Sequence, residues 1–279
     1  MNNAQAVNAV STARRGNMAT VDFVAPILSA MLAAESLTEA GELPVQFSGD
    51  AATYAESNGL RDALEGNYRR PVRGGLQGQT YSQLARLQSP EDVDFCNTII
   101  ADLLYYQLGD QQSVAAELAK IVGELHDNVV SHAAGAGFSS AQVYKQQDHR
   151  SRIEYAIADV GRGFLYNART AQPEIATDQE AIQWAVRKGT TSGRVNDWAQ
   201  RLPSDVPESP YPPSTDTTYT ENHHLGLGLY DLCEVVRELN GRLWICSGDG
   251  TVQVIGDRVR SDTAAIAWQG VAIEFEVFA

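Results

Sequence analysis

The middle of the chain has the clearest pattern of apolar and polar residues. Apolar side chains recur there every three or four residues, which places them along one face of an α-helix. The residues of this stripe are Val114, Leu118, Ile121, Val122, Leu125 and Val129. We therefore expect a long amphipathic helix over residues 114–132, with Ser113 as its N-cap.

The first hundred residues mix helical and strand periodicities. Helical spacing predicts helices over residues 24–37, 52–64 and 91–107, with a break in the second at Asn58-Gly59. Alternating apolar and polar residues in LPVQFSG predict a strand within residues 43–49. These elements together predict a small α/β domain over residues 1–108.

The second half of the chain also combines strand and helix patterns. The runs AQVYKQ and RIEYAIADVG predict a hairpin, and four strands are predicted near the C-terminus, in RLWICSG, TVQVIG, TAAIAWQ and VAIEFEVF. Helices are predicted over residues 176–189 and within 225–241. Residues 193–222 hold five of the chain's ten prolines, so we expect a long mobile loop there. We expect residues 193–224 to act as a lid. These elements predict a second domain over residues 109–279.

Charge and cysteine content narrow the classes of function. The 279-residue chain has a net charge of −14 and a pI near 4.7, which argues against a large nucleic-acid surface, because phosphate contacts need clustered Lys and Arg. The three cysteines, Cys96, Cys233 and Cys246, show no framework spacing and favour a reducing compartment. No signal-peptide core is visible, and the most apolar early stretch is too short to cross a bilayer. We expect a soluble, cytoplasmic protein with no nucleic-acid or membrane partner.

The stretch GELHDNVVSH places four polar side chains within five positions of the long predicted helix. Glu124 and Asn128 are four residues apart, so they share one helix face. A carboxylate beside an amide oxygen can orient a water molecule and bind a hard cation such as Mg²⁺. For this spacing alone, a solvated helix face is the commoner interpretation. We expect His126 and Asp127 at the edge of such a site or bonded to the residues around it.

A second polar motif, IADVGRGF, follows a predicted strand. Asp159 lies at the strand end, where a half-buried carboxylate can accept a hydrogen bond from an exocyclic amine such as that of adenine. Gly161 and Gly163 allow the backbone to approach another group closely. A simple turn is the alternative.

A third motif, HHLGLGLYDL, contains two glycines immediately before a predicted helix. Free N–H groups and the helix dipole at such a position suit phosphate oxygens. A tight turn from loop to helix is the alternative interpretation of this motif.

The order of the three motifs resembles the N, G1 and G2 boxes of the GHKL ATPases. That superfamily includes histidine-kinase catalytic domains, anti-sigma-factor serine kinases, gyrase-type topoisomerases, MutL-type repair proteins and heat-shock chaperones. The resemblance covers residues 112–279 and is nearest to stand-alone bacterial members that carry E-x-x-x-N-x-x-x-H, here Glu124, Asn128 and His132. It implies an α/β fold of the Bergerat type, a sandwich in which helices cover one face of a mixed β-sheet. The preceding domain faintly resembles STAS-like domains.

The resemblance implies ATP and Mg²⁺ as ligands and gives each motif a role. Asn128 would bind Mg²⁺ between the ATP phosphates, Glu124 would be the catalytic general base, and Asp159 would hold the adenine amino group. Gly161 and Gly163 would shape the adenine side of the pocket. The phosphates would be held under the lid by the glycine-rich run before the last helix, which comprises Leu225, Gly226, Leu227, Gly228 and Leu229.

Two positions depart from the family pattern. Ser131 stands where many histidine kinases have a lysine, and Val271 follows Gly270 where a threonine is usual. Three functions stay open: an ATPase that switches a protein partner or its own dimer, a serine kinase of the anti-sigma type acting on a STAS partner, and a scaffold with a degenerate nucleotide pocket. Glu124 favours slow ATP hydrolysis, because a carboxylate can accept a proton from water.

Overall fold

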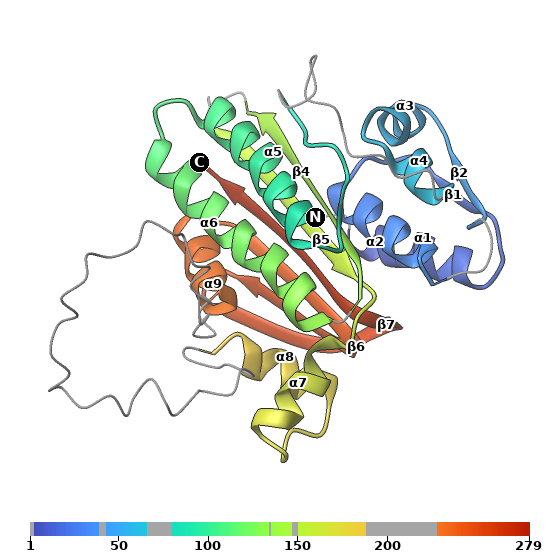
Figure 1. Cartoon of the computed structure of the whole chain (residues 1–279), viewed down its shortest axis with the longest axis vertical. Coiled ribbons are helices and arrows are strands. Elements are labelled where there is room, and N and C mark those ends of the chain that lie inside the picture. The colour runs from blue at the N-terminus through green and yellow to red at the C-terminus, as the bar shows by residue number, and fades with distance from the viewer. Residues whose placement is uncertain (1–2, 39–42, 66–79, 134, 147–149, 188–227) are drawn as a thin grey trace, which may run out of the picture.

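The computed structural model (Figure 1) describes residues 3–38, 43–65, 80–133, 135–146, 150–187 and 228–279. The elements of the first ninety residues are α1 (Asn3–Arg14), β1 (Ala19–Val21), α2 (Pro26–Ser36), β2 (Val45–Phe47), α3 (Asp50–Ser57), α4 (Leu60–Leu64) and β3 (Ala85–Leu87). The elements that follow are α5 (Pro90–Leu108), α6 (Gln112–Asn128), the π-helical turn η1 (Val129–Ala133), β4 (Gly137–Lys145), β5 (Ser151–Asp159), α7 (Gly163–Ala171), α8 (Asp178–Ala185), α9 (Gly228–Glu238), β6 (Arg242–Ile255) and β7 (Arg258–Phe278). None of the described helices combines the length and apolar character that a bilayer crossing requires.

Local sequence signals explain most of these elements. The predicted helix over 52–64 is divided into α3 and α4 at Asn58-Gly59, where Gly59 has a φ of 84° and the Asn58 side chain accepts the Leu60 N–H at 3.0 Å. Ser89 and Asp92 form a reciprocal capping box at the start of α5. Thr177 and Glu180 form a second such box at α8. The α/β character predicted for the chain is therefore confirmed.

The main sheet has five strands in the order β3-β4-β5-β7-β6, and all four neighbouring pairs are antiparallel. The mixed sheet that the resemblance implies is thus wrong for the described strands. Connectivity gives the reason for two of these pairs: the chain from Lys145 to Ser151 and from Ile255 to Arg258 is too short for the crossover that parallel strands need. The one parallel pair, β1 with β2, forms a separate two-stranded sheet in the described part of the chain.

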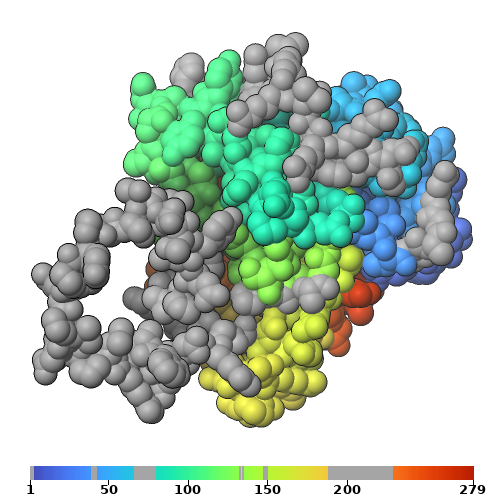
Figure 2. All heavy atoms as spheres, in the orientation of Figure 1, coloured from blue at the N-terminus to red at the C-terminus, as the bar shows by residue number. Residues whose placement is uncertain are grey.

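Both faces of the five-stranded sheet are covered by helices. On one face, α5, α6, α8 and α9 enclose a core that includes Tyr155 and Phe275. On the other face, α1 and α2 enclose a core that includes Phe138, Ala156 and Trp268. Tyr155 and Ala156 are consecutive, so β5 contributes alternate side chains to the two cores. On the face shown in Figure 2, residues of α5 and α6 (green), of the N-terminal helices (blue) and of α7 and α8 (yellow) occupy separate regions of the surface.

The predicted boundary at residues 108 and 109 falls between α5 and α6. These two helices pack on each other, lie on the same face of the sheet and share one core. The strand β3, from the first hundred residues, pairs with β4. Residues on both sides of the boundary therefore build the same sheet.

The C-terminal end contains two long strands, β6 and β7, and not the four short strands that the sequence predicts. The Ser-Gly-Asp-Gly stretch that suggested a turn is an irregularity inside β6, where the pairing register shifts on either side of Gly248. Gly248 has a φ of 55°, and a side chain there would overlap the Asp178 carboxylate at the start of α8. The Asp249 N–H donates to the same carboxylate at 3.3 Å. Glycine is thus needed at position 248 both for the bulge and for the close packing of the α8 N-terminus against it.

Candidate functional site

The first motif lies at the C-terminal end of α6. Glu124 is 19% exposed and forms an ion pair with Lys120 one turn earlier, with 3.7 Å between Nζ and Oε1. Asn128, half-buried, is the last α-helical residue, and the chain continues as the π-helical turn η1. Their four-residue spacing on an observed helix confirms that the two side chains share a face. Single π-helical turns are rare and often occur at functional sites.

His126 lies on the opposite side of α6, inside the core. Its Nδ1 is 2.6 Å from the Asn97 side-chain oxygen on α5, and its ring is fully buried. Because that oxygen can only accept, Nδ1 carries the proton. Burial lowers the pKa of His126 from 6.5 to about 3, so the ring is neutral at ordinary pH. His126 therefore anchors α6 to α5 from within the core.

The second motif places Asp159 at the end of β5, in a buried position. Its Oδ1 accepts the Gly161 N–H at 2.8 Å. Burial raises the pKa of Asp159 from 3.8 to about 7, and the backbone N–H groups of Gly161 and Val271 oppose this rise. The carboxylate is therefore desolvated and only partly compensated, which is characteristic of functional positions.

The glycines of this motif bring the first two motifs into contact. A side chain at Gly161 would overlap the Ala133 carbonyl oxygen in η1. The next residue, Arg162, donates its N–H to that same oxygen at 2.9 Å. Gly163 has a φ of 70°, and a side chain there would lie 2.8 Å from the Ser247 Oγ. The close approach that these glycines permit is thus to the protein's own backbone and side chains, and it joins the end of β5 to the turn that follows Asn128.

A segment of β7 holds the same strand end from the other side. The Trp268 Nε1–H donates to the Asp159 main-chain oxygen at 3.1 Å, and the Gln269 side chain donates to the Val160 oxygen at 3.3 Å. Gly270 has a φ of 95°, and a side chain there would overlap the Asp159 main-chain oxygen. Sequence reasoning missed Trp268. A tryptophan three residues before the unusual Val271 is the signal that could have suggested it.

The third motif is described only from its last glycine. Gly228 is the first residue of α9, whereas Leu225, Gly226, Leu227 and the predicted lid 193–224 lie outside the described residues. Leu229 is buried in the core on the α6 side of the sheet.

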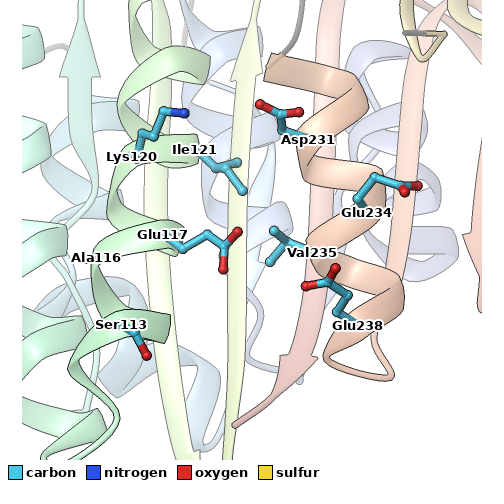
Figure 3. Close-up of a pocket in the computed structure, with 9 residues that line it drawn as sticks. All are labelled: Ser113, Ala116, Glu117, Lys120, Ile121, Asp231, Glu234, Val235 and Glu238. Atoms are coloured by element: carbon cyan, nitrogen blue, oxygen red, sulfur yellow. The ribbon is translucent and has the colours of Figure 1, made fainter.

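The helices α6 and α9 run antiparallel on either side of a groove of about 440 Å³ (Figure 3). Lys120 and Asp231 face each other at one end of it, and Ser113 and Glu238 lie at the other. One turn beyond Lys120 is Glu124, and one turn before Asp231 is Gly228. The α9 N-terminus therefore lies at the same level as the first motif.

The candidate residues differ in the ligand groups that their chemistry suits. The Asp159 carboxylate fits an amine donor, because such a donor offsets its desolvation. Glu124 offers a carboxylate and Asn128 offers an amide oxygen. Among the described residues, no cluster of three His, Cys, Asp or Glu suited to a metal occurs. This donor set fits Mg²⁺, which takes one or two protein ligands together with phosphate oxygens and water.

Comparison of the chain with protein-family models, with curated proteins and with solved structures finds no match.

Proposed function

We propose that the protein binds an adenine nucleotide with Mg²⁺, hydrolyses ATP slowly and uses the bound nucleotide as a regulatory switch for a protein partner or its own dimer. The observation that carries this proposal is the buried Asp159 carboxylate at the end of β5, held one contact away from the turn that follows Asn128. The motif order E-x-x-x-N, D-x-G-x-G and G-x-G-L, typical of GHKL ATPases, supports it.

The physical argument for adenine starts from the state of Asp159. A buried carboxylate with only backbone N–H partners is costly, and a ligand amine that donates to it recovers part of that cost. The 6-amino group of adenine is such a donor, and the inosine base, which has a carbonyl there, is not. Preference for adenine over hypoxanthine nucleotides follows from this difference.

The argument for hydrolysis concerns Glu124. Its carboxylate is partly exposed, lies one helical turn from Asn128 and pairs with Lys120, which lines the groove between α6 and α9. Water that attacks the terminal phosphorus must lose a proton, and Glu124 would accept it as the P–O bond to ADP breaks. Bound Mg²⁺ would neutralise phosphate charge, with Asn128 as a protein ligand.

The first experiment measures binding by calorimetry, using MgATP, MgADP and MgITP with the wild type and Asp159→Asn. We expect micromolar to millimolar adenine binding, weaker inosine binding, and loss of the preference in Asp159→Asn. Equal affinity for the two bases in the wild type would refute the assignment of Asp159.

The second experiment measures phosphate release from MgATP by the wild type, Glu124→Gln and Glu117→Gln. Glu117 is the matched control, because it lies on the same helix two turns earlier and lines the groove. We expect Glu124→Gln alone to lower the rate, by roughly 10²-fold or more for loss of a general base, with binding retained. Labelled ATP in the presence of a STAS protein separates hydrolysis from transfer to a serine, since only the kinase would label the protein.

A further inference from the structure

We propose that Trp268 and Arg14 position Asp159, which makes the N-terminal helix α1 a working part of the nucleotide site. Where it concerns ligand affinity, this inference rests on the proposed function. Its structural half concerns the Asp159 carboxyl itself and can be measured without any ligand.

The first step of the argument is the contact between β7 and the end of β5. Trp268 is 1% exposed, and its Nε1–H donates to the main-chain oxygen of Asp159 at 3.1 Å. Gly270 packs so closely against the same residue that a side chain would overlap both its main-chain oxygen and Oδ1. The carboxyl and the main-chain oxygen belong to one residue, so a shift of residues 268–270 moves both.

The second step is the contact between Trp268 and α1. Arg14 is the last residue of α1, and its guanidinium carbon lies 5.7 Å from the centre of the Trp268 ring. Its Nη1 donates to the Ala267 main-chain oxygen at 2.8 Å. Arg14 therefore holds both the ring of Trp268 and the backbone immediately before it.

The third step is what fixes Arg14. Its Nε and Nη2 donate to the two carboxylate oxygens of Glu35 on α2, at 2.6 and 2.5 Å. Glu35 is only 3% exposed and Arg14 is 29% exposed, so the carboxylate is shielded from water, and the bidentate contact gives the pair a defined geometry. The path from α2 through Arg14 and Trp268 to Asp159 consists of hydrogen bonds and one cation–π contact.

A filling role in the core would explain the burial of Trp268 but not these contacts. Trp244 serves as the comparison: it is 4% exposed, lies in the same core and belongs to β6, which is separated from β5 by β7. Arg15 is the comparison for Arg14, because its described bonds go to Ser11 within α1. The chain thus offers a matched control for each residue.

The ligand-free experiment follows the carboxyl carbon of Asp159 by NMR as a function of pH, with Asp159→Asn used to assign the signal. The variants are Trp268→Phe, which removes the N–H donor and keeps a ring, and Arg14→Gln. We expect the pKa of Asp159 to fall toward the ordinary aspartate range in both, because a loosened strand end admits water to a carboxyl whose pKa is raised by burial. We expect Trp244→Phe and Arg15→Gln to leave it unchanged. An unchanged pKa in both Trp268→Phe and Arg14→Gln would overturn the inference.

The binding experiment measures MgADP affinity of the same four variants by calorimetry. We expect Trp268→Phe and Arg14→Gln to weaken binding roughly three- to tenfold, as for the loss of one buried hydrogen bond, and the controls to bind normally. Normal affinity in both variants, despite a shifted pKa, would overturn the link to the nucleotide. If the wild type bound neither MgADP nor MgATP, the proposed function would fail, while the carboxyl titration would still decide whether Trp268 and Arg14 position Asp159.

Discussion

Replacing Asp159 by asparagine should make the protein more stable at pH 8 and change its stability little at pH 4. The unfolded chain releases the Asp159 proton near pH 3.8, whereas the folded protein keeps it until about pH 7. The folded pKa is raised, so the stability that this group contributes is fully present below pH 4 and is lost as the pH rises through 7. Asparagine does not ionise, so the variant avoids that loss.

The size of the effect follows from the shift. A rise from 3.8 to about 7 is about three pKa units, and each unit corresponds to about 1.36 kcal/mol, so the free energy of unfolding should differ by up to about 4 kcal/mol between the two ends of the pH range. Asp159 is almost fully buried, so bulk solvent screens this effect little. A cost of this size at a single residue is typical of positions retained for function.

Urea denaturation of the wild type and Asp159→Asn from pH 4 to pH 8 would measure this difference. Subtracting the two curves removes the contributions of other titrating groups. We expect the difference to grow by about 1 kcal/mol per pH unit between pH 4.5 and 6.5 and to level off above pH 7.5. A flat difference between the two curves would refute the desolvated carboxylate.

Three further changes test other parts of the structure. In the same denaturation series, His126→Gln should lose less stability than the wild type between pH 6.5 and 4.5. In this range the unfolded wild type takes up a proton on His126, whereas the folded protein, with its lowered pKa, does not, so the wild type is destabilised as the pH falls. Gly161→Ala should lower the melting temperature, at a cost of roughly 1–3 kcal/mol for an overpacked site. Gly123 lies inside α6, and a carbon added there would be 3.6 Å from Asn97, an ordinary contact. Gly123→Ala should therefore be neutral or stabilising by about 0.5–1 kcal/mol. The three buried cysteines should react with a thiol reagent only after denaturation, and rapid labelling of the native protein would contradict their burial.

Periodicity in the sequence was sufficient to predict α2, α5, α6 and the β4–β5 hairpin. Their apolar residues repeat at one period over a long stretch, and breaks such as Asn58-Gly59 carry their own backbone signal. The β6–β7 hairpin was misread as four strands because glycine allows a bulge as readily as a turn. Whether the chain forms a bulge or a turn at Gly248 depends on Asp178, a residue far away in the sequence that packs against this glycine.

Within the candidate site, sequence spacing placed Glu124 and Asn128 on one helix face and Asp159 at a strand end, as the structure has them. It could not show that His126 points into the core, because its partners there, Asn97 on α5 and Tyr155 on β5, come from other parts of the chain. The roles of Trp268 and Arg14 also escaped prediction. The contacts of Trp268 with Asp159 and of Arg14 with Ala267 join residues more than a hundred positions apart, and no local pattern encodes such pairs.

The bulge in β6 has a consequence for the behaviour of the protein in solution. β6 is the last strand of the sheet, and within the described residues its outer edge pairs with no other strand. A straight edge of 14 residues would offer a template for another chain to add a strand and begin aggregation. The register shifts at Gly248 divide this edge into two short segments, and the Asp178 carboxylate places a negative charge where they meet. The irregularity that seats α8 thereby also protects the sheet against edge-to-edge association.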